Sequence, residues 1–457
     1  MGARTKEDLR KMKRDTEEIY DVAYGKMYRA RQSVSTVLTP QVISGNENLN
    51  ALLDIIIEDA IDVEARNIDI YKDAKGYGVV QLRVGRDMVD DRLLDPDAVD
   101  GLGIICRKRA SVNIEQEFKS EINGSIRYKY LNKQYDLRCA FLPTIQGMSM
   151  SIRILYSSTL MTDISLLGFP ANVEETFRNS LQANQGMILI TGGTSSGKTT
   201  SQYTGLNTIM QGARNTKNIR TVENPVEYTL SGVKQTQVNE EEGETFSKIL
   251  KSFLRGDPNI ILVGEINDAE TAMTAVRAAT SGHLVMSTLH TNNTIEVTRV
   301  MQHYGASYID LGNALQLVMN QILENKLCPN CRTRRTVTEE EYLWIRKRLG
   351  VDDNITVLYE KATDGSCKEC NGIGYKGATL IVEMLETDYA YQRALNKAKD
   401  NTFELQELLL KDPDANFYPI GRDVFRHLKI GNIDFQTAKR IMKKQTGETL
   451  QEKGEGR

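Results

Sequence analysis

A short apolar strand that runs directly into a glycine-rich loop constrains this chain more than any other feature. Residues 186–200 read GMILITGGTSSGKTT, in which the pattern G-x-x-x-x-G-K-T follows the apolar run. Glycines in this pattern let backbone N–H groups curl around phosphates, the lysine reaches their oxygens, and the Thr199 hydroxyl would ligate Mg²⁺. The helix-like segment that follows points its positive end at the same anion. The predicted nucleotide phosphate site comprises Gly192, Gly193, Thr194, Ser195, Ser196, Gly197, Lys198, Thr199 and Thr200.

Two further predicted strands end in acidic residues. NIILVGE, residues 259–265, ends in Glu265, and NIRTVENPVEY, residues 218–228, carries Glu223 shortly before Pro225 stops the strand. Beside a phosphate-binding loop, a carboxylate at a strand end can polarise an attacking water and help to hold the metal shell. We therefore expect Glu265 to act in hydrolysis, and the alternative is an acid that only faces solvent.

Histidine is scarce in this chain, yet two of its four histidines bracket one apolar run, TSGHLVMSTLH at 280–290. Seven residues of extended strand span ~23 Å, so His283 and His290 cannot ligate one metal ion together. In an open parallel sheet, ligands bind at the carboxyl ends of the strands, and residues that follow those ends converge on one crevice. His290 is thus predicted to sense a γ-phosphate, whereas His283 is either functional or a hydrogen-bonded structural histidine.

The pattern of strands and helices divides the chain into several parts. A length of 457 residues predicts roughly two to four domains. Strands alternate strictly with helices up to about residue 325, which implies a parallel sheet with helices on both faces. The predicted parts are a polar arm or partial docking segment at 1–48, a small α/β domain at 49–156, a linker at 157–166, an α/β core at 167–325, a cysteine-bearing element at 326–385 and a helical region at 386–457.

Four of the six cysteines form two C-x-x-C pairs, CPNC with Cys328 and Cys331 and CKEC with Cys367 and Cys370. Each pair can present two thiolates to one Zn²⁺, and two pairs complete a tetrahedron. We therefore predict a structural zinc site, with a redox-active pair as the alternative. The other two cysteines, at 106 and 139, are interpreted as small core residues.

Composition narrows the class of protein without identifying it. The formal net charge is −3, so no global basic field favours nucleic acid. The apolar runs are far shorter than the ~20 residues that span a bilayer, and the first residues lack the apolar segment of a secretory signal. Six cysteines in 457 residues suit a reducing compartment, so the cytoplasm is the expected location.

Taken together, the motifs resemble those of the hexameric ATPases of type II secretion and type IV pilus assembly. Four boxes of that family appear in order: GGTSSGKT, VENPVEY, DPNIILVGE and SGHLVMSTLHTNN. The resemblance implies a RecA-like P-loop ATPase core preceded by a small PAS-like α/β domain, with ATP and Mg²⁺ bound between the two. A tetracysteine zinc element at this place is typical of assembly and secretion members, whereas pilus-retraction ATPases generally lack it.

The resemblance also implies catalytic roles for individual residues. Glu265 would activate water with support from Glu223, and His290 would report on the γ-phosphate. Two arginines in YDLRCAFLPTIQGMSMSIRIL match arginines that the family closes over the nucleotide, and the alternative is a pair of surface arginines on an alternating strand. The implied catalytic set is Lys198, Glu223, Glu265, His290, Arg138 and Arg153.

The sequence departs from the family pattern at several positions. Asn224 replaces the Asp of the usual Glu-Asp-Pro, and Asn267 replaces the usual arginine after the strand-end acid. These departures point to a divergent branch, such as a type IVb or plasmid-encoded pilus system.

The machine implied by the resemblance is a homohexamer that sits peripherally on the cytoplasmic face of the inner membrane. It would power assembly of a type IV pilus or a type II secretion pseudopilus. Its expected partners are an inner-membrane platform protein and a cytoplasmic docking protein. The alternatives are a conjugation or DNA-transfer ATPase and a nucleotide-binding zinc scaffold without turnover.

Overall fold

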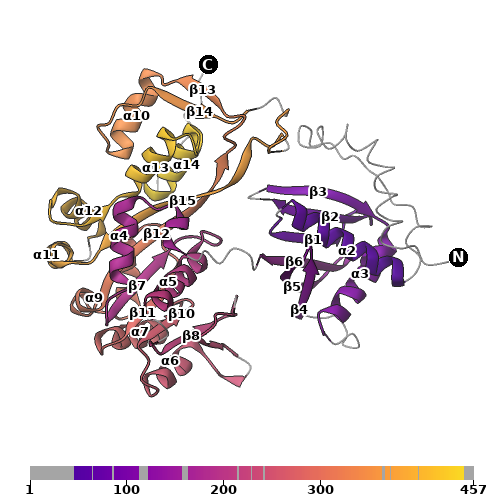
Figure 1. Cartoon of the computed structure of the whole chain (residues 1–457), viewed down its shortest axis with the longest axis horizontal. Coiled ribbons are helices and arrows are strands. Elements are labelled where there is room, and N and C mark those ends of the chain that lie inside the picture. Colours follow the sequence, from indigo (N-terminus) through magenta and orange to yellow (C-terminus); the bar gives the residue numbers. More distant parts are fainter. Residues whose placement is uncertain are drawn as a thin grey trace. The chain divides into compact units, whose positions relative to one another are not determined.

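The computed structural model describes residues 46–446, apart from 64, 85–86, 113–121, 157–162, 214–215, 228, 240–241, 363–365, 371 and 400. Nearly all of the predicted N-terminal arm, most of the predicted linker and the end of the predicted helical region therefore lie outside the described residues. The chain forms two compact units (Figure 1). The first contains residues up to Thr159 and the short stretch Asp364–Ile373, and the second contains the rest of the chain from Leu160 onward.

The first unit is a six-stranded antiparallel sheet with two helices packed against it (Figure 1). Its elements are α2 (Asn46–Asp62), β1 (Asn67–Lys72), β2 (Gly78–Val84), β3 (Asp87–Leu94), α3 (Pro96–Arg109), β4 (Ile122–Tyr130), β5 (Lys133–Thr144) and β6 (Gly147–Tyr156). The strand order is β3-β2-β1-β6-β5-β4. Alternate strand residues, such as Ile68 and Ile70, are fully buried in one core with both helices. This is expected of a sheet covered on one face, because successive side chains of a strand point to opposite faces.

The second unit is built on an eight-stranded sheet of order β16-β15-β12-β7-β11-β10-β8-β9. Its strands are β7 (Gly186–Thr191), β8 (Ile219–Glu223), β9 (Lys234–Gln237), β10 (Ile260–Val263), β11 (Leu284–Leu289), β12 (Leu315–Leu327), β15 (Tyr375–Glu386) and β16 (Phe417–Tyr418). All neighbours from β12 to β9 are parallel, which confirms the predicted parallel sheet. β15 and β16 extend the sheet in antiparallel fashion.

Helices cover both faces of this sheet, as the alternating pattern predicted (Figure 1). In β7, Met187 and Leu189 join a core with α6, α7 and α9, whereas Ile188 and Ile190 join the opposite core with η3, α4 and α5. Burial on both faces explains why these strands read as continuous apolar runs. The bounds are η3 (Ile164–Leu167), α4 (Ala171–Ser180), α5 (Lys198–Ala213), α6 (Phe246–Leu254), α7 (Ala269–Thr280), α8 (Glu296–His303) and α9 (Tyr308–Ala314).

The residues after β12 form an insertion, which returns to the sheet as β15, and then a helical region, as predicted. Their remaining elements are β13 (Thr333–Thr336), α10 (Glu339–Leu349), β14 (Val357–Glu360), α11 (Tyr389–Ala398), α12 (Thr402–Lys411), α13 (Ile420–Lys429) and α14 (Phe435–Thr446). β13 and β14 pair as a small antiparallel sheet. Helix α10 of the insertion shares an apolar core with α13 and α14.

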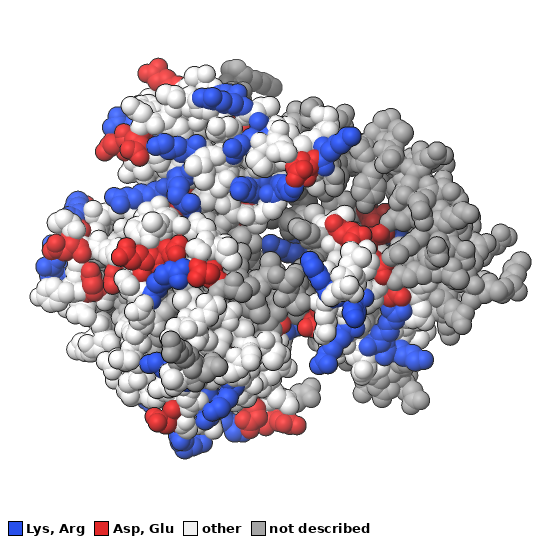
Figure 2. All heavy atoms as spheres, in the orientation of Figure 1, with Lys and Arg blue, Asp and Glu red and all other residues white. Residues whose placement is uncertain are grey.

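The surface of the described residues is mixed in charge. Acidic and basic side chains are interspersed on the face shown in Figure 2, in keeping with a formal net charge of −3. None of the described helices combines the length and the apolar content that crossing a membrane requires. The large apolar clusters of the described residues are instead buried cores within the two units.

Candidate functional site

The glycine-rich loop lies between the end of β7 and the start of α5. Three of its residues have a positive φ angle, 138° at Gly192, 60° at Ser195 and 91° at Gly197. Glycine adopts such angles without steric penalty, which accounts for two of these three positions. The loop leads into Lys198, Thr199 and Thr200 in the first turn of α5, where backbone N–H groups have no partner within the helix. A loop of this kind, followed by the N-terminus of a helix, can bind an anion through its backbone N–H groups.

The ammonium group of Lys198 is held by the loop itself. Its Nζ atom donates hydrogen bonds to the carbonyl oxygens of Gly192 at 2.8 Å and Gly193 at 2.9 Å. Burial lowers the pKa of Lys198 below its ordinary value, and the negative charge of Glu265 acts in the opposite direction. Lys198 and Glu265 therefore lie within electrostatic reach of each other.

Other atoms of the loop also fit a phosphate group. Ser196 Oγ is buried and has no hydrogen-bond partner among the residues that the structure describes. A side chain at Gly193 would meet no atom within 4 Å, so the loop is open at this point. A buried polar atom without a partner costs free energy, which a bound phosphate oxygen would recover. The half-buried Thr199 follows Lys198 and is the residue whose hydroxyl would ligate Mg²⁺.

Position 192 is expected to tolerate only glycine. A Cβ atom there would lie 2.3 Å from the Gln321 carbonyl oxygen and 2.7 Å from Ser196 Oγ. We expect Gly192→Ala to lower the free energy of unfolding by about 1–3 kcal/mol, measured by urea denaturation. Gly193→Ala is the matched control, because its Cβ atom meets nothing, and a change within about 0.5 kcal/mol is expected. Equal losses in the two variants would contradict this account of position 192.

Glu265 and His290 follow the ends of two neighbouring strands, β10 and β11, which pair in parallel. The His290 Nε2 atom lies 3.9 Å from one Glu265 carboxylate oxygen, and the two side chains are 53% and 37% exposed. Asn267 Nδ2 donates a hydrogen bond to the other carboxylate oxygen at 3.3 Å. The structure thus brings together Lys198, Glu265 and His290, and leaves the carboxylate accessible to a ligand.

Glu223 ends β8, beside β10, and its carboxylate is almost completely buried. One oxygen accepts a short hydrogen bond from the Tyr203 hydroxyl. The other accepts from the Thr221 hydroxyl at 2.5 Å and from the Gln235 amide at 3.2 Å. Glu223 packs next to Gly264, the residue before Glu265. It therefore adjoins the backbone that carries Glu265 while its own carboxylate is occupied by internal donors.

The other predicted residues have different surroundings. His283 precedes β11, at the opposite end of the strand from His290, and its Nδ1 atom lies 3.0 Å from the Ala278 carbonyl oxygen. This contact is typical of a structural histidine. Arg138 and Arg153 belong to the first unit, where they are register partners on β5 and β6.

The four cysteines come together, as their spacing predicted. The Sγ atoms of Cys328, Cys331, Cys367 and Cys370 all lie within 4.8 Å of one another. Four sulfurs at ~2.3 Å from a tetrahedral Zn²⁺ are about 3.8 Å apart, so the cluster has the size and the donor chemistry of a structural zinc site. The other two cysteines are buried in the first unit.

Two polar residues inside β12 contact the strand-end site, and the sequence assigns neither of them a role there. Asn320 Nδ2 donates to Thr191 Oγ1 at 2.9 Å and to the Thr291 carbonyl oxygen at 3.0 Å. The Gln321 amide donates to Ser201 Oγ at 2.9 Å. Buried amides are retained where they are hydrogen-bonded. The only signal in the sequence is that this pair interrupts the apolar run LQLVMNQIL.

Comparison with known proteins places these features in a family context. The family described as type II/IV secretion system proteins matches residues 43–427. The type IV pilus assembly ATPase PilB of Pseudomonas aeruginosa is 37% identical over 306 residues, which cover 66% of this chain and 52% of that protein. The type II secretion system protein E of Aeromonas hydrophila is 34% identical over 348 residues, which cover 76% of this chain and 67% of that protein. The chain thus spans about half to two thirds of the length of these curated relatives.

A solved structure shares the fold. The X-ray structure of the Legionella pneumophila ATPase DotB matches with a TM-score of 0.64 and covers 91% of this chain and 98% of that chain. The two sequences are 19% identical, so this likeness concerns the fold alone.

Proposed function

Because the chain belongs to the family of type II/IV secretion system proteins, we propose that it is a Mg-ATP-hydrolysing motor of such a system. The observation that supports this most directly is the convergence of Lys198, Glu265 and His290 where parallel strands end. In α/β proteins this edge, with a glycine-rich loop at a helix N-terminus, is where nucleotides bind. The relatives named above are a pilus assembly ATPase and a type II secretion protein, which favours a motor over a passive binder.

Each residue of the site has its own task in the proposed reaction. Lys198 exchanges its bonds to the loop carbonyls for bonds to phosphate oxygens, and Thr199 supplies a hydroxyl ligand for Mg²⁺. When bound there, Mg²⁺ would supply positive charge against the phosphates. Glu265 has an accessible carboxylate, so it orients the attacking water and accepts its proton. His290 contacts the γ-phosphate and, at 3.9 Å from Glu265, changes its surroundings when that phosphate leaves.

The finer parts of the proposal rest on the family resemblance. Arg138 and Arg153 contribute positive charge during hydrolysis, a role that suits guanidinium groups because they stay ionised and fork onto phosphate. Zn²⁺ binds the four clustered cysteines. Six copies of the chain form a ring on the cytoplasmic face of the inner membrane. This ring docks on a platform protein and a cytoplasmic docking protein, and drives assembly of a type IV pilus or a type II secretion pseudopilus.

Hydrolysis of ATP by the purified protein tests the proposed chemistry. We expect Mg²⁺-dependent phosphate release by the wild-type protein, and release at the level of the blank by Lys198→Ala. No turnover above Lys198→Ala, even with membranes and partners present, would contradict the proposal and favour a zinc-bearing scaffold.

A pull-down from the native cell tests the proposed machine. Tagged Glu265→Gln protein, slowed in hydrolysis, should retain partners through gentle solubilisation of the membrane. We expect it to bring down a polytopic membrane protein encoded beside pilin-like genes. Recovery of a relaxase or of DNA would instead assign the chain to a conjugation system.

The two histidines that bracket β11 form a matched pair for mutation. We expect His290→Ala to lower kcat by about 10–100-fold, because His290 lies beside Glu265 at the edge where the nucleotide binds. His283→Ala should leave kcat within about twofold, since the His283 side chain contacts Ser281 and Ala278 at the other end of the strand and the substitution leaves its backbone bonds in place. Steady-state phosphate release measures both. Equal losses of kcat in the two variants would show that the substitutions act by disturbing the packing of β11, and not by removing a contact between His290 and the γ-phosphate.

A further inference from the structure

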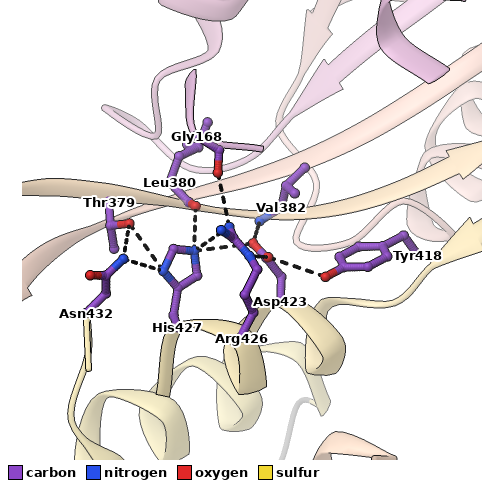
Figure 3. Close-up of polar contacts among 9 residues, drawn as sticks. All are labelled: Gly168, Thr379, Leu380, Val382, Tyr418, Asp423, Arg426, His427 and Asn432. Atoms are coloured by element: carbon purple, nitrogen blue, oxygen red, sulfur yellow. Dashed lines mark hydrogen bonds and ion pairs between the residues drawn. The ribbon is translucent and has the colours of Figure 1, made fainter. Parts of the chain in front are cut away.

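Helix α13 turns an acidic side chain and a histidine toward the interior of the protein (Figure 3). Asp423 is 0% exposed and His427 is 2% exposed. The Asp423 carboxylate accepts hydrogen bonds from the Val382 N–H at 2.9 Å and from Arg426 Nε at 2.6 Å. Burial acts to raise the pKa of Asp423, but hydrogen bonds from His427 and Arg426 outweigh it and lower the pKa. Asp423 is therefore a buried carboxylate that docks α13 on β15.

Arg426 extends this contact to the first described residues of the second unit. Its Nη2 atom donates a hydrogen bond to the Gly168 carbonyl oxygen at 3.1 Å (Figure 3). Gly168 ends η3 in a left-handed conformation, with a φ angle of 74°. The other end of η3 begins at Asp163, which pairs with Arg178 of α4 at 2.6 Å. The segment 163–168 is thus held at one end by α4 and at the other by α13.

The beginning of α13 is held by a second buried carboxylate, Glu383 of β15, which is 3% exposed. One Glu383 oxygen accepts from the N–H of Ile420, the first residue of α13, at 3.4 Å. The N-cap residue, Pro419, makes no side-chain cap bond, so this carboxylate takes the favourable place at the positive end of the helix. The other oxygen accepts both the N–H and the hydroxyl of Thr294, each at 2.7 Å.

Thr294 belongs to the loop that follows His290. The same loop is fixed at Thr291, whose carbonyl oxygen accepts from Asn320 Nδ2 at 3.0 Å. The loop therefore has one anchor on β12 and one on β15. A displacement of His290 that moves this loop acts directly on Glu383.

We propose that α13 couples the loop after His290 to the segment 163–168, with Glu383 and Arg426 as positioning residues at its two ends. The inference rests on the proposed function, because it takes His290 to respond to a phosphate. A hydrogen-bonded helix moves as one body, so a shift at its first turn is carried to Arg426. The segment 163–168 directly follows, in sequence, the residues that join the two units.

A matched pair of variants at Thr294 tests the first link. Thr294→Val keeps the shape and the backbone bond but removes the hydroxyl bond to Glu383, whereas Thr294→Ser keeps it. We expect Thr294→Val to lower kcat about tenfold, the effect of losing one such bond in the transition state, with KM for ATP within about twofold. Affinity for a fluorescent ADP analogue should not change, and Thr294→Ser should match the wild-type protein.

A double-mutant cycle tests the path along α13. Arg426→Gln removes the charge and the bond to Gly168, and it should lower kcat by a similar factor with the same small change in KM. If both residues act through one element, the double variant with Thr294→Val loses no more than the stronger single variant. If Arg426→Gln does not fold, Arg426→Lys takes its place, since a single ammonium cannot reproduce the fork toward both Asp423 and Gly168.

Several outcomes would overturn the coupling. Additive losses of kcat would show two independent effects. A Thr294→Val protein that unfolds at a lower temperature but retains its kcat would reduce the contact to structural packing. Absence of ATP turnover in the wild-type protein would instead contradict the proposed function, and the coupling would fail with it.

Discussion

Replacing Glu265 by Gln is expected to slow ATP hydrolysis by about 10²–10⁴-fold while nucleotide binding is retained. Glutamine has the shape of glutamate but cannot take a proton from the attacking water. The Glu265 side chain is 37% exposed, so its replacement leaves no buried charge unpaired. Binding depends mainly on the loop and on Lys198, which this substitution leaves in place. Phosphate release under steady-state conditions gives the rate, and equilibrium titration with a fluorescent ATP analogue gives the affinity.

A second glutamate provides the control for this experiment. Glu270 lies at the start of α7, where its 65% exposed side chain pairs with Lys251. Glu270→Gln makes the same chemical change outside the site, and kcat is expected to stay within about twofold. If Glu265→Gln hydrolyses ATP as fast as the wild-type protein, Glu265 is not the catalytic base.

Removing one cysteine of the cluster is expected to release zinc and to loosen the insertion between β12 and β15. Structural zinc contributes about 10–16 kcal/mol to the folding of small metal-bound domains, far more than one hydrogen bond does. In this chain the N–H of Cys328, directly after β12, donates to the Gly374 carbonyl oxygen, directly before β15, at 3.0 Å. Loss of the metal therefore acts where the insertion leaves and rejoins the sheet. We expect Cys370→Ser to lower the first thermal transition by about 5 °C or more.

Metal content decides the interpretation of that result. Elemental analysis of the wild-type protein should give about one zinc per chain, and Cys370→Ser should give almost none. Cys106→Ala is the matched control, because Cys106 is a buried cysteine of the first unit, and it should retain the metal. A wild-type protein that holds no zinc but forms a reversible disulfide within the cluster would establish a redox pair instead.

The strand-end site could be predicted from the sequence because local patterns determine its main features. The loop at 192–199 follows an apolar strand, and Glu265 and His290 each follow the end of another. Parallel pairing then brings such ends to one edge, whatever the lengths of the connections. The two C-x-x-C pairs were predicted to meet for a different reason, because two such pairs supply the four thiolates of one zinc site. These inferences needed only strand ends, spacing and the chemistry of the side chains.

Other parts of the fold depend on tertiary contacts that no local pattern contains. Residues 375–386 follow a turn-rich stretch with cysteines, so the antiparallel strand β15 was not distinguished there from the insertion. Glu383 and Asp423 read as ordinary acids of a strand and a helix, yet the fold buries both and supplies backbone donors. Likewise, Glu223 ends a strand as expected, but two of the three donors around its carboxylate, Tyr203 and Gln235, come from other elements of the fold.

The close approach of β12 to the glycine-rich loop has a consequence for genetics. The atom that a side chain at position 192 would strike first is the carbonyl oxygen of Gln321, which every amino acid would present there. At Gly186, by contrast, the nearest obstructing atoms belong to the side chain of Gln316. A shorter side chain at 316 would therefore remove this obstruction and suppress part of the defect of a replacement at 186, while the strain of the φ angle of 118° there would remain. For a replacement at 192, no substitution at 321 can act in this way, because the obstacle is the main chain itself.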